Sequence, residues 1–261
     1  MMRIIDGKKI ANDILAQLKQ EIQKKSIKLR LAVILIGNNP ASHLYVKMKE
    51  EVGQNLGIEI EKHFLSNEIK EQEIINLIDS LNKNKRINGI LVQLPLPQGF
   101  STDRIIKKIS IEKDIDGLLS ESRFDSPFIL AIYEAIKNTR ENLKNKRIIA
   151  LVNSDIFGKS LYNFFLKHES VEIDYIKEYN KDIIKKADIL ITALGQPEIV
   201  KENMIKKGAI LIDGGISKIN NKIKGDINIE SVKHKVKWLS PVPGGLGPLT
   251  VAFLFKNIIE I

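Results

Sequence analysis

The segment Leu31-Ala-Val-Ile-Leu-Ile36, followed by Gly37-Asn-Asn-Pro40, decides the fold class of this chain. An unbroken apolar run of this length, with no polar alternation, is typical of a β-strand that is buried on both faces. The Gly-Asn-Asn-Pro stretch ends the strand, because these residues favour turns. Upstream, apolar side chains recur at every fourth position from Ile10 to Ile22, which predicts an amphipathic helix. A helix followed by a doubly buried strand indicates an α/β protein.

The same alternation continues to the end of the chain and predicts two domains. Further helices are expected near residues 42–56, 74–81, 128–136, 159–167 and 249–261, and further strands near residues 58–64, 89–94, 147–152, 171–176, 188–192, 209–213 and 236–239. Repeated strand–helix–strand units predict right-handed crossovers and parallel sheets. We expect an N-terminal α/β domain of residues 1–121 and a Rossmann-type parallel-sheet domain of residues 122–246. The last helix, within residues 247–261, has no strand after it and can cover either domain.

The composition excludes several classes of protein. The chain has 261 residues, of which 43% are hydrophobic and 28% are charged, as in soluble globular proteins. It contains no cysteine, which excludes disulfides, thiolate nucleophiles and cysteine-bound metals. Its apolar runs are strand-length, far short of the roughly 20 residues that span a bilayer. Because the N-terminus also lacks the apolar core of a secretory signal, we expect a cytoplasmic protein without membrane contact.

The formal net charge of +9 raises the question of nucleic-acid binding. The basic residues are spread along the whole chain, and no aromatic residues interleave with them as a stacking surface requires. A basic nucleic-acid-binding protein therefore remains only a remote alternative. The four histidines show no metal-binding spacing with the acidic residues, so no metal is expected.

Tyr45 and Lys49 form the first candidate pair for chemistry. They stand four residues apart on an expected helix, so both side chains leave the same face. A catalytic lysine needs a lowered pKa, which burial and a neighbouring polar group can supply. From these residues alone, a solvated lysine on an amphipathic helix is the favoured interpretation.

The stretch Gly89-Ile-Leu-Val-Gln-Leu-Pro-Leu-Pro97 brings an amide to the end of a buried strand. Gln93 interrupts the apolar run at the carboxyl end of the strand, where α/β sheets place their ligands. The side chain either belongs to a site or satisfies the backbone of a loop. The prolines at 95 and 97 cannot continue a central strand, so they give the following loop a fixed geometry.

Two further segments carry candidate site residues. In Lys113-Asp-Ile-Asp-Gly117, an extended backbone would point Asp114 and Asp116 in the same direction, although one of them can instead cap the turn. In Ser240-Pro-Val-Pro-Gly-Gly-Leu-Gly-Pro-Leu-Thr250, glycines and prolines fix a loop just before a helix N-terminus. Bare backbone of this kind can approach a ligand closely.

The four segments occur in the order Pro40-Ala-Ser-x-x-Tyr45-x-x-x-Lys49, Gly89 to Pro97, Lys113 to Gly117 and Pro241-Val-Pro-Gly-Gly-Leu-Gly-Pro248. Together they resemble the bifunctional methylenetetrahydrofolate dehydrogenase/methenyltetrahydrofolate cyclohydrolase family over nearly the full chain. The resemblance implies two α/β domains that flank a cleft, with the C-terminal helix returning to the first domain. It also implies a homodimer that binds a folate and a dinucleotide. A short-chain dehydrogenase also uses Tyr-x-x-x-Lys, but only after a nucleotide-binding unit, whereas Tyr45 precedes any such unit.

The resemblance implies a role for each candidate residue. Lys49 would transfer protons, with Gln93 holding its amine uncharged for part of the cycle. Tyr45 would stack on the folate ring system, and Asp116 would accept from the amino-pyrimidine edge of the pterin. The remaining implied substrate contacts are Leu94, Pro95, Pro243, Gly244 and Gly245. The implied chemistry is oxidation of methylene-tetrahydrofolate to methenyl-tetrahydrofolate, followed by hydrolysis to formyl-tetrahydrofolate, with tetrahydrofolate as the one-carbon carrier.

The dinucleotide site departs from the family pattern. The family has a Gly-Arg-Ser sequence where this chain has Val152, Asn153 and Ser154, so the arginine that would hold the ribose phosphate of NADP is missing. A second family pair that contacts this phosphate is replaced near Lys177 and Glu178, where the acid would repel it and Lys177 or Lys159 would have to compensate. A family Thr-Pro-x-Gly segment has become Ser-Pro-Phe-Ile at 126–129. The remaining implied cofactor residues, Gly195, Gly215 and Ile216, follow the family.

Because the sheet and the later cofactor loops follow the family, NADP is the expected cofactor. NAD is the alternative, given Val152 and Asn153. A cyclohydrolase that has weakened or lost its NADP-dependent step is the second function left open by the sequence. A folate-binding protein without catalysis is the third, and it would tolerate the loss of Lys49.

Overall fold

The structure is a computed structural model that describes residues 2–219 and 222–261. It divides into two compact units. The three-stranded unit comprises residues 11–127 and 251–261, and the six-stranded unit comprises residues 2–10 and 128–250. Each unit is described separately below.

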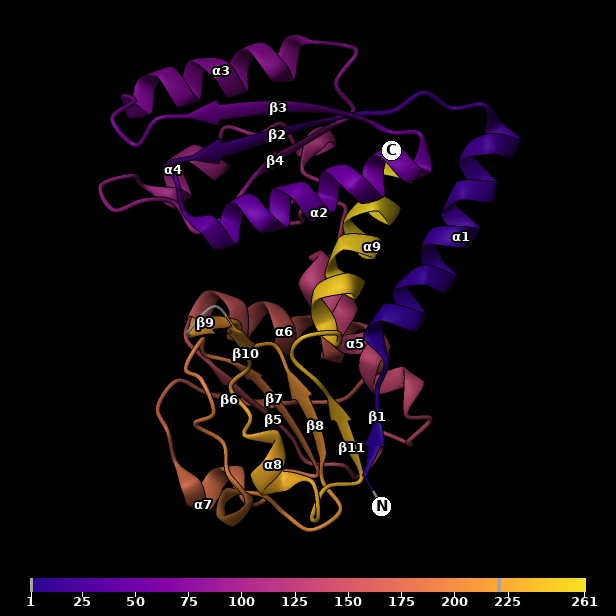
Figure 1. Cartoon of the computed structure of the whole chain (residues 1–261), viewed down its shortest axis with the longest axis vertical. Helices are drawn as coiled ribbons and strands as arrows, with labels where there is room; N and C mark the ends of the chain where they lie inside the picture. Colours follow the sequence, from indigo (N-terminus) through magenta and orange to yellow (C-terminus); the bar gives the residue numbers. More distant parts are fainter. Residues whose placement is uncertain (1, 220–221) are drawn as a thin grey trace. The chain divides into compact units, whose positions relative to one another are not determined.

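The secondary structure alternates between helices and strands, as the sequence predicts (Figure 1). The α-helices are α1 (Gly7–Lys25), α2 (Pro40–Leu56), α3 (Glu71–Lys83), α4 (Thr102–Ile106), α5 (Pro127–Asn138), α6 (Asp155–Glu169), α7 (Lys181–Ile184), α8 (Ile229–Val232) and α9 (Leu246–Ile259), with 3-10 turns η1 (Ile111–Lys113) and η2 (Glu202–Met204). The strands are β1 (Arg3–Ile4), β2 (Arg30–Ile36), β3 (Glu59–Leu65), β4 (Gly89–Val92), β5 (Ile148–Val152), β6 (Asp174–Ile176), β7 (Ile189–Ala193), β8 (Ile210–Asp213), β9 (Ser217–Ile219), β10 (Lys222–Lys224) and β11 (Trp238–Ser240).

The three-stranded unit is built around β2, the strand that the sequence predicts to be buried on both faces. Its sheet has the parallel order β3-β2-β4. Along β2, Leu31, Val33 and Leu35 face one apolar cluster. Ala32, Ile34 and Ile36 face another, which α3 covers (Figure 1). Successive side chains of a strand point to opposite faces, so an unbroken apolar run fills both cores at once.

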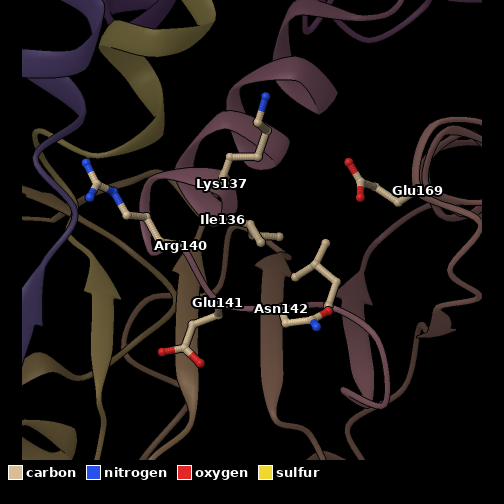
Figure 2. A pocket seen from close by; sticks show the side chains of 7 residues that line it. Ile136, Lys137, Arg140, Glu141, Asn142 and Glu169 are labelled. Carbon is tan, nitrogen blue, oxygen red and sulfur yellow. The ribbon is translucent and has the colours of Figure 1, made fainter.

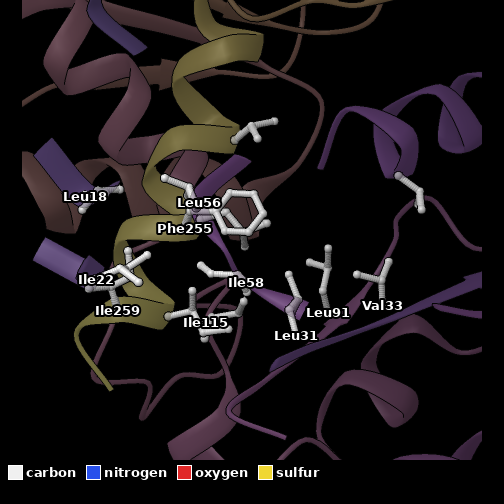
Figure 3. Close-up of a cluster of buried hydrophobic side chains, with 14 of the residues drawn as sticks. Leu18, Ile22, Leu31, Val33, Leu56, Ile58, Leu91, Ile115, Phe255 and Ile259 are labelled. Atoms are coloured by element: carbon white, nitrogen blue, oxygen red, sulfur yellow. The ribbon is translucent and has the colours of Figure 1, made fainter. Parts of the chain in front are cut away.

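The first of these clusters contains the C-terminal helix. Phe255 and Ile259 of α9 pack with Leu56 of α2 and Leu31 of β2 (Figure 3). Asn257 of α9 is buried, and its amide nitrogen donates to two backbone carbonyls, Ile115 O at 2.9 Å and Asp125 O at 3.2 Å. Residues 251–261 therefore belong to the three-stranded unit, which confirms that the last helix returns to the first domain.

Three residues fix the conformation of the loop that carries Asp114 and Asp116. Lys113 Nζ donates to the carbonyls at the end of α3, Leu81 O, Asn82 O and Asn84 O, at 2.8 to 2.9 Å. Asp114 is fully buried and accepts from the amides of residues 118 and 119. Gly117 has a φ of +61°, and a Cβ there would lie 2.6 Å from a backbone oxygen. Asp114 is thus the acid that fixes the turn, and Asp116 is left free for a site.

The six-stranded unit has the parallel sheet order β1-β11-β8-β7-β5-β6. Its central strands are apolar and buried, because they lie between layers of packed side chains. Parallel strands point their carboxyl ends to one edge, so the segments after β5, β6, β7 and β8 meet there. The sequence predicts this Rossmann-type sheet correctly.

The two units divide the chain at residues 10/11, 127/128 and 250/251, whereas the sequence prediction places its boundaries at 121/122 and 246/247. Residues 2–10 belong to the six-stranded unit, because β1 pairs in parallel with β11 through Arg3↔Trp238 and Ile4↔Leu239. A strand this short gives no recognisable pattern in sequence. The β9–β10 hairpin and the short helices α7 and α8 are absent from the sequence prediction for the same reason.

The anchoring of α9 gives a stability prediction. Asn257→Ala leaves two buried carbonyls without their donor, so we expect the free energy of unfolding to fall by about 2 kcal/mol. Chemical denaturation measures this change. Asn138→Ala, at an exposed residue near the end of α5, serves as the control and is expected to change it by less than about 0.5 kcal/mol. Equal losses in the two variants would contradict the anchoring role of Asn257.

Candidate active site

A buried lysine and a glutamine meet in the three-stranded unit. Lys49 leaves α2, and its Nζ donates to Gln93 Oε1 at 2.7 Å. Gln93 directly follows β4, and its backbone amide still donates to Ile34 O of β2 at 2.8 Å. The Gln93 amide nitrogen donates in turn to Leu94 O at 2.7 Å. This second bond directs the carbonyl oxygen of Gln93 toward the lysine, so the amide bonds both to Lys49 and to the backbone of the following loop.

Burial makes this lysine a weaker base than an ordinary one. The Lys49 side chain is only 8% exposed. Removal from water lowers the pKa of Lys49 because it penalises the charged amine, while attraction to the Asp116 carboxylate acts in the opposite direction. Burial also raises the pKa of Asp116, against the stabilising charge of Lys49. The two groups are therefore coupled, and the amine can change its charge at the site.

The other predicted folate contacts of this unit lie in the same region of its sequence and structure. Tyr45 precedes Lys49 by one helical turn on α2, is half-buried, and has its pKa raised by burial. Leu94 accepts from Gln93, as described above, and Pro95 follows it on an exposed stretch. α2 itself begins at Pro40, where Asn39 Oδ1 accepts from the amides of residues 41 and 42 at 2.9 and 3.2 Å. This cap fixes the start of the helix that presents Tyr45 and Lys49.

The proline–glycine loop belongs to the six-stranded unit. Gly244 has a φ of +100°, and its carbonyl accepts from Lys8 N at 3.1 Å. A Cβ on Gly7 would overlap Gly245 O at 1.8 Å, so two glycines let these segments touch. Pro243 is exposed. The role of Pro243, Gly244 and Gly245 in closing a folate pocket stays a prediction.

The predicted cofactor residues gather at the carboxyl edge of the six-stranded sheet. Val152 ends β5 and is fully buried. Asn153 is exposed, and its amide nitrogen donates to Leu194 O at 3.4 Å. Ser154 caps α6 by accepting from Phe157 N. Gly195 follows β7, and Gly215 follows β8. β5 pairs with β7 and β7 pairs with β8, so the structure brings these residues to one edge of the sheet. Ile216 lies beyond this edge and is 41% exposed.

Two buried carboxylates, which the sequence analysis does not assign, hold these loops. Asp226 accepts from Leu194 N and Gln196 N, both at 2.7 Å. Asp213 accepts from the amides of Gly215, Asp226 and Ile227, each at 3.0 Å. Burial raises the pKa of Asp213 to about 6 despite these donors. The Asp213–Asp226 pair therefore fixes the backbone on both sides of Gly195 and Gly215.

Glycine is required at two positions beside this pair. A Cβ on Gly215 would lie 2.1 Å from the Asp226 carboxyl group, and a Cβ on Gly225 would lie 2.0 Å from Asp213 Oδ2. Gly195 differs, since it adopts a φ of +71° and has no atom closer than 4.0 Å to its Cβ position. The sequence contains the signal for the pair in Asp213-Gly-Gly-Ile216 and Gly225-Asp-Ile227. Only the structure shows that the carboxylates bind both loops.

A separate cavity of about 350 Å³ lies elsewhere on the six-stranded unit (Figure 2). Side chains near the ends of α5 and α6 line it, including Lys137, Arg140, Glu141 and Glu169. These helix ends lie toward the amino edge of the sheet, so the cavity contains none of the predicted site residues. Glu141 forms ion pairs with Lys146 and Lys237, and Glu169 accepts from Tyr133.

Two features are absent from the described residues. Among residues 2–219 and 222–261, no group of three or more His, Cys, Asp or Glu side chains is placed to hold a metal ion. Within the same residues, no helix combines the length and the apolar character needed to cross a membrane.

The fold and the site define an α/β enzyme of two units, one with a buried amine and one with a Rossmann-type sheet. The family model for the catalytic domain of tetrahydrofolate dehydrogenase/cyclohydrolase matches residues 5–116, and the model for its NAD(P)-binding domain matches residues 128–261. The chain belongs to the tetrahydrofolate dehydrogenase/cyclohydrolase family.

Individual relatives agree with this assignment. The chain is 43% identical to the bifunctional protein FolD of Rickettsia canadensis, covering 100% of this chain and 96% of the relative. The crystal structure of the bifunctional FolD enzyme from Campylobacter jejuni matches with a TM-score of 0.90 at 34% identity, over 100% of this chain and 98% of the other. The Trypanosoma brucei enzyme, solved with NADP and an inhibitor, matches with a TM-score of 0.90 at 26% identity, over 98% of this chain and 96% of that one.

The coupling between Lys49 and Asp116 gives a prediction about charge. Asp116→Asn removes the carboxylate that raises the pKa of Lys49, so we expect this pKa to fall below its value in the unmodified chain. Titration of the 13C-labelled lysine side chain by NMR measures the midpoint. Glu51→Gln, which removes an exposed acid from the same helix, is the control and should leave the midpoint unchanged. A higher or equal midpoint in Asp116→Asn would contradict the coupling.

The Asp213–Asp226 pair gives a prediction about local order. Asp226→Asn places an NH2 group against one of two backbone donors, so we expect the free energy of unfolding to fall by about 2 kcal/mol. Amide hydrogen exchange at Leu194 and Gln196 should accelerate at the same time. The exposed Asp182→Asn in the same unit is the control. Unchanged exchange at both amides would show that Asp226 does not hold the loop.

Proposed function

We propose that Lys49 is the proton-transfer group of a methylenetetrahydrofolate dehydrogenase and methenyltetrahydrofolate cyclohydrolase. The observation that carries the proposal is the 2.7 Å bond from the buried Lys49 Nζ to Gln93 Oε1. Burial lowers the pKa of the Lys49 amine, so at a given pH a larger share of it is neutral and able to accept a proton than of an exposed lysine. The substrate is methylene-tetrahydrofolate. The first step gives methenyl-tetrahydrofolate, and the second gives formyl-tetrahydrofolate.

The cyclohydrolase step needs the lysine most. Water adds its oxygen to the methenyl carbon, and the neutral Lys49 amine accepts the proton that the water loses. The carbon–nitrogen bond of the ring then breaks as the lysine ammonium returns its proton to the departing ring nitrogen. The hydroxyl on the same carbon loses its remaining proton to solvent as it becomes the formyl carbonyl. Gln93 offers only an oxygen to the amine, so it orients Lys49 in both of its charge states.

The other residues of this unit bind the pterin in our proposal. Asp116 is half-buried, and a carboxylate there can accept two N–H bonds from the amino-pyrimidine edge. Tyr45 presents its ring from the same face of α2 as Lys49, in position to stack on a flat heterocycle. Leu94 and Pro95 directly follow Gln93 and are further folate contacts in this proposal. Pro243, Gly244 and Gly245 remain proposed folate contacts.

The six-stranded unit holds the dinucleotide in this proposal, and its carboxyl edge fits such a group. Two residues separate the end of β5 from the start of α6, and those amides of its first turn that Ser154 does not cap can donate to a pyrophosphate. Gly195 leaves open space where a Cβ would stand. When bound, a nicotinamide dinucleotide supplies the acceptor for the hydride from the methylene bridge. Asn153, Ser154, Gly195 and Ile216 are exposed or half-buried and would contact it, whereas Val152 and Gly215 are buried and would shape the loops around it. We further propose a homodimer acting in the cytoplasm, as the family resemblance implies.

Removal of the amine tests the proposal. Lys49→Met is expected to reduce methenyl-tetrahydrofolate hydrolysis by at least roughly a hundredfold, the usual size of a lost acid–base group. The loss of absorbance of the methenyl chromophore measures the rate, and circular dichroism checks the fold. Lys47→Met is the matched control: it removes an exposed lysine from the same helix, and its rate should stay unchanged.

The same preparations separate the alternatives. Unchanged hydrolysis in Lys49→Met would refute the catalytic role of Lys49. A chain that binds folate but hydrolyses nothing would be a binding protein only. Formation of the methenyl chromophore from methylene-tetrahydrofolate with added dinucleotide reports the dehydrogenase step separately.

A further inference from the structure

The end of β6 carries charged residues at the place where a Rossmann-type sheet meets the adenosine ribose. β6 pairs in parallel with β5, with Leu151 opposite Ile176, so the two strands end side by side. In such folds the turn after the first strand approaches the pyrophosphate, and the end of the next strand reaches the ribose hydroxyls or a 2′-phosphate. Lys177 and Glu178 directly follow β6 and occupy that position.

The cation at this position is already paired. Lys177 Nζ forms an ion pair with the carboxylate of Asp155, the first residue of α6. A hydrogen bond from Lys177 to Asp155 is the main reason that the pKa of Lys177 is raised, and the charges of Asp155 and Glu178 add to it. The amine is therefore already paired with a carboxylate, although both side chains are about half exposed, so a phosphate would have to compete with Asp155 for it.

The anion at this position is free. Glu178 is exposed, and its carboxylate has no hydrogen bond or ion pair among the described residues. The charge of Glu178 helps to raise the pKa of Lys177. Asp155, Lys177 and Glu178 together carry one net negative charge. The neighbouring turn adds no cation, because Asn153 is neutral and its amide bonds to Leu194 O.

These observations lead to an inference that rests on the proposed dinucleotide site. We propose that this chain selects NAD over NADP, with Glu178 as the acceptor for the adenosine ribose hydroxyls and the Asp155–Lys177 ion pair withholding the nearest cation. A ribose diol donates hydrogen bonds, which a free carboxylate accepts. A 2′-phosphate at the same place would meet that carboxylate as a like charge at short range.

Lys159 is the competing cation. It lies one helical turn beyond Asp155 on the same face of α6, is exposed, and forms no ion pair among the described residues. If Lys159 reached a 2′-phosphate, it would offset the charge of Glu178. The experiment therefore includes this residue.

Binding measurements on the full chain test the selection without turnover. Isothermal titration calorimetry with NAD and with NADP, in the absence of folate, gives the two Kd values. We expect NAD to bind at least roughly tenfold more tightly than NADP, since a single unfavourable charge contact commonly accounts for that factor. In Asp155→Asn combined with Glu178→Ser, which frees Lys177, the NADP Kd should fall roughly tenfold and the NAD Kd should rise.

Two further variants make the result specific. Asp103→Asn combined with Glu121→Gln removes the same two charges from exposed positions in the other unit, and it should leave the ratio of the two Kd values unchanged. Glu178→Ser alone changes an exposed side chain without a bonding partner, so it should fold and should shift the ratio in the same direction as the double variant.

Several outcomes would overturn the selection. If the unmodified chain bound NADP more tightly than NAD, the proposed selection would be wrong. If this preference for NADP were then lost in Lys159→Gln, Lys159 would be the phosphate ligand. Failure to bind either dinucleotide would also overturn it. If the ratio of the two Kd values stayed unchanged in both variants that lack Glu178, that residue would have no role in the selection. Hydrolysis of methenyl-tetrahydrofolate by the same preparation reports on Lys49 independently, so the proposed function stands or fails separately.

Discussion

The amine of Lys49 is held almost without water against a neutral amide oxygen, and the proposed chemistry depends on this constraint. Burial alone favours the neutral amine, while the Asp116 carboxylate favours the charged one. Burial is the larger of the two effects, so the pKa of Lys49 is lowered, which favours the proton transfer that we propose for it. A stronger ion pair would fix the charge, and full exposure to water would restore the ordinary basicity of lysine.

The sequence predicts the framework of this site well because the framework depends on local patterns. The apolar run at 31–36 lies in β2, Tyr45 and Lys49 lie four residues apart on α2, and Gln93 directly follows the strand β4. It leaves open which of two acids is free. That distinction depends on Asp114 accepting from amides four and five residues later, a contact that spacing alone does not specify.

Other features lie beyond sequence reasoning because they join distant segments. β1 pairs with β11 across more than two hundred residues of chain, so residues 2–10 fall in the six-stranded unit and not in the first domain. The Asp213–Asp226 pair binds loops after β7 and β8, and its carboxylates occupy the space where side chains of Gly215 and Gly225 would stand. Glycines that a motif assigns to the cofactor are thus also required by buried acids.

The net charge of the chain and the charges at the end of β6 have opposite effects on a dinucleotide with an additional phosphate. The net charge of +9 favours the approach of any anion, including a dinucleotide with an additional phosphate. At the end of β6, however, the nearest ammonium is bound by Asp155 and the next side chain is an unpaired carboxylate. Coulombic interactions weaken with distance and with salt, so contacts within a few ångströms of the ribose decide selectivity while the diffuse field affects mainly the rate of encounter.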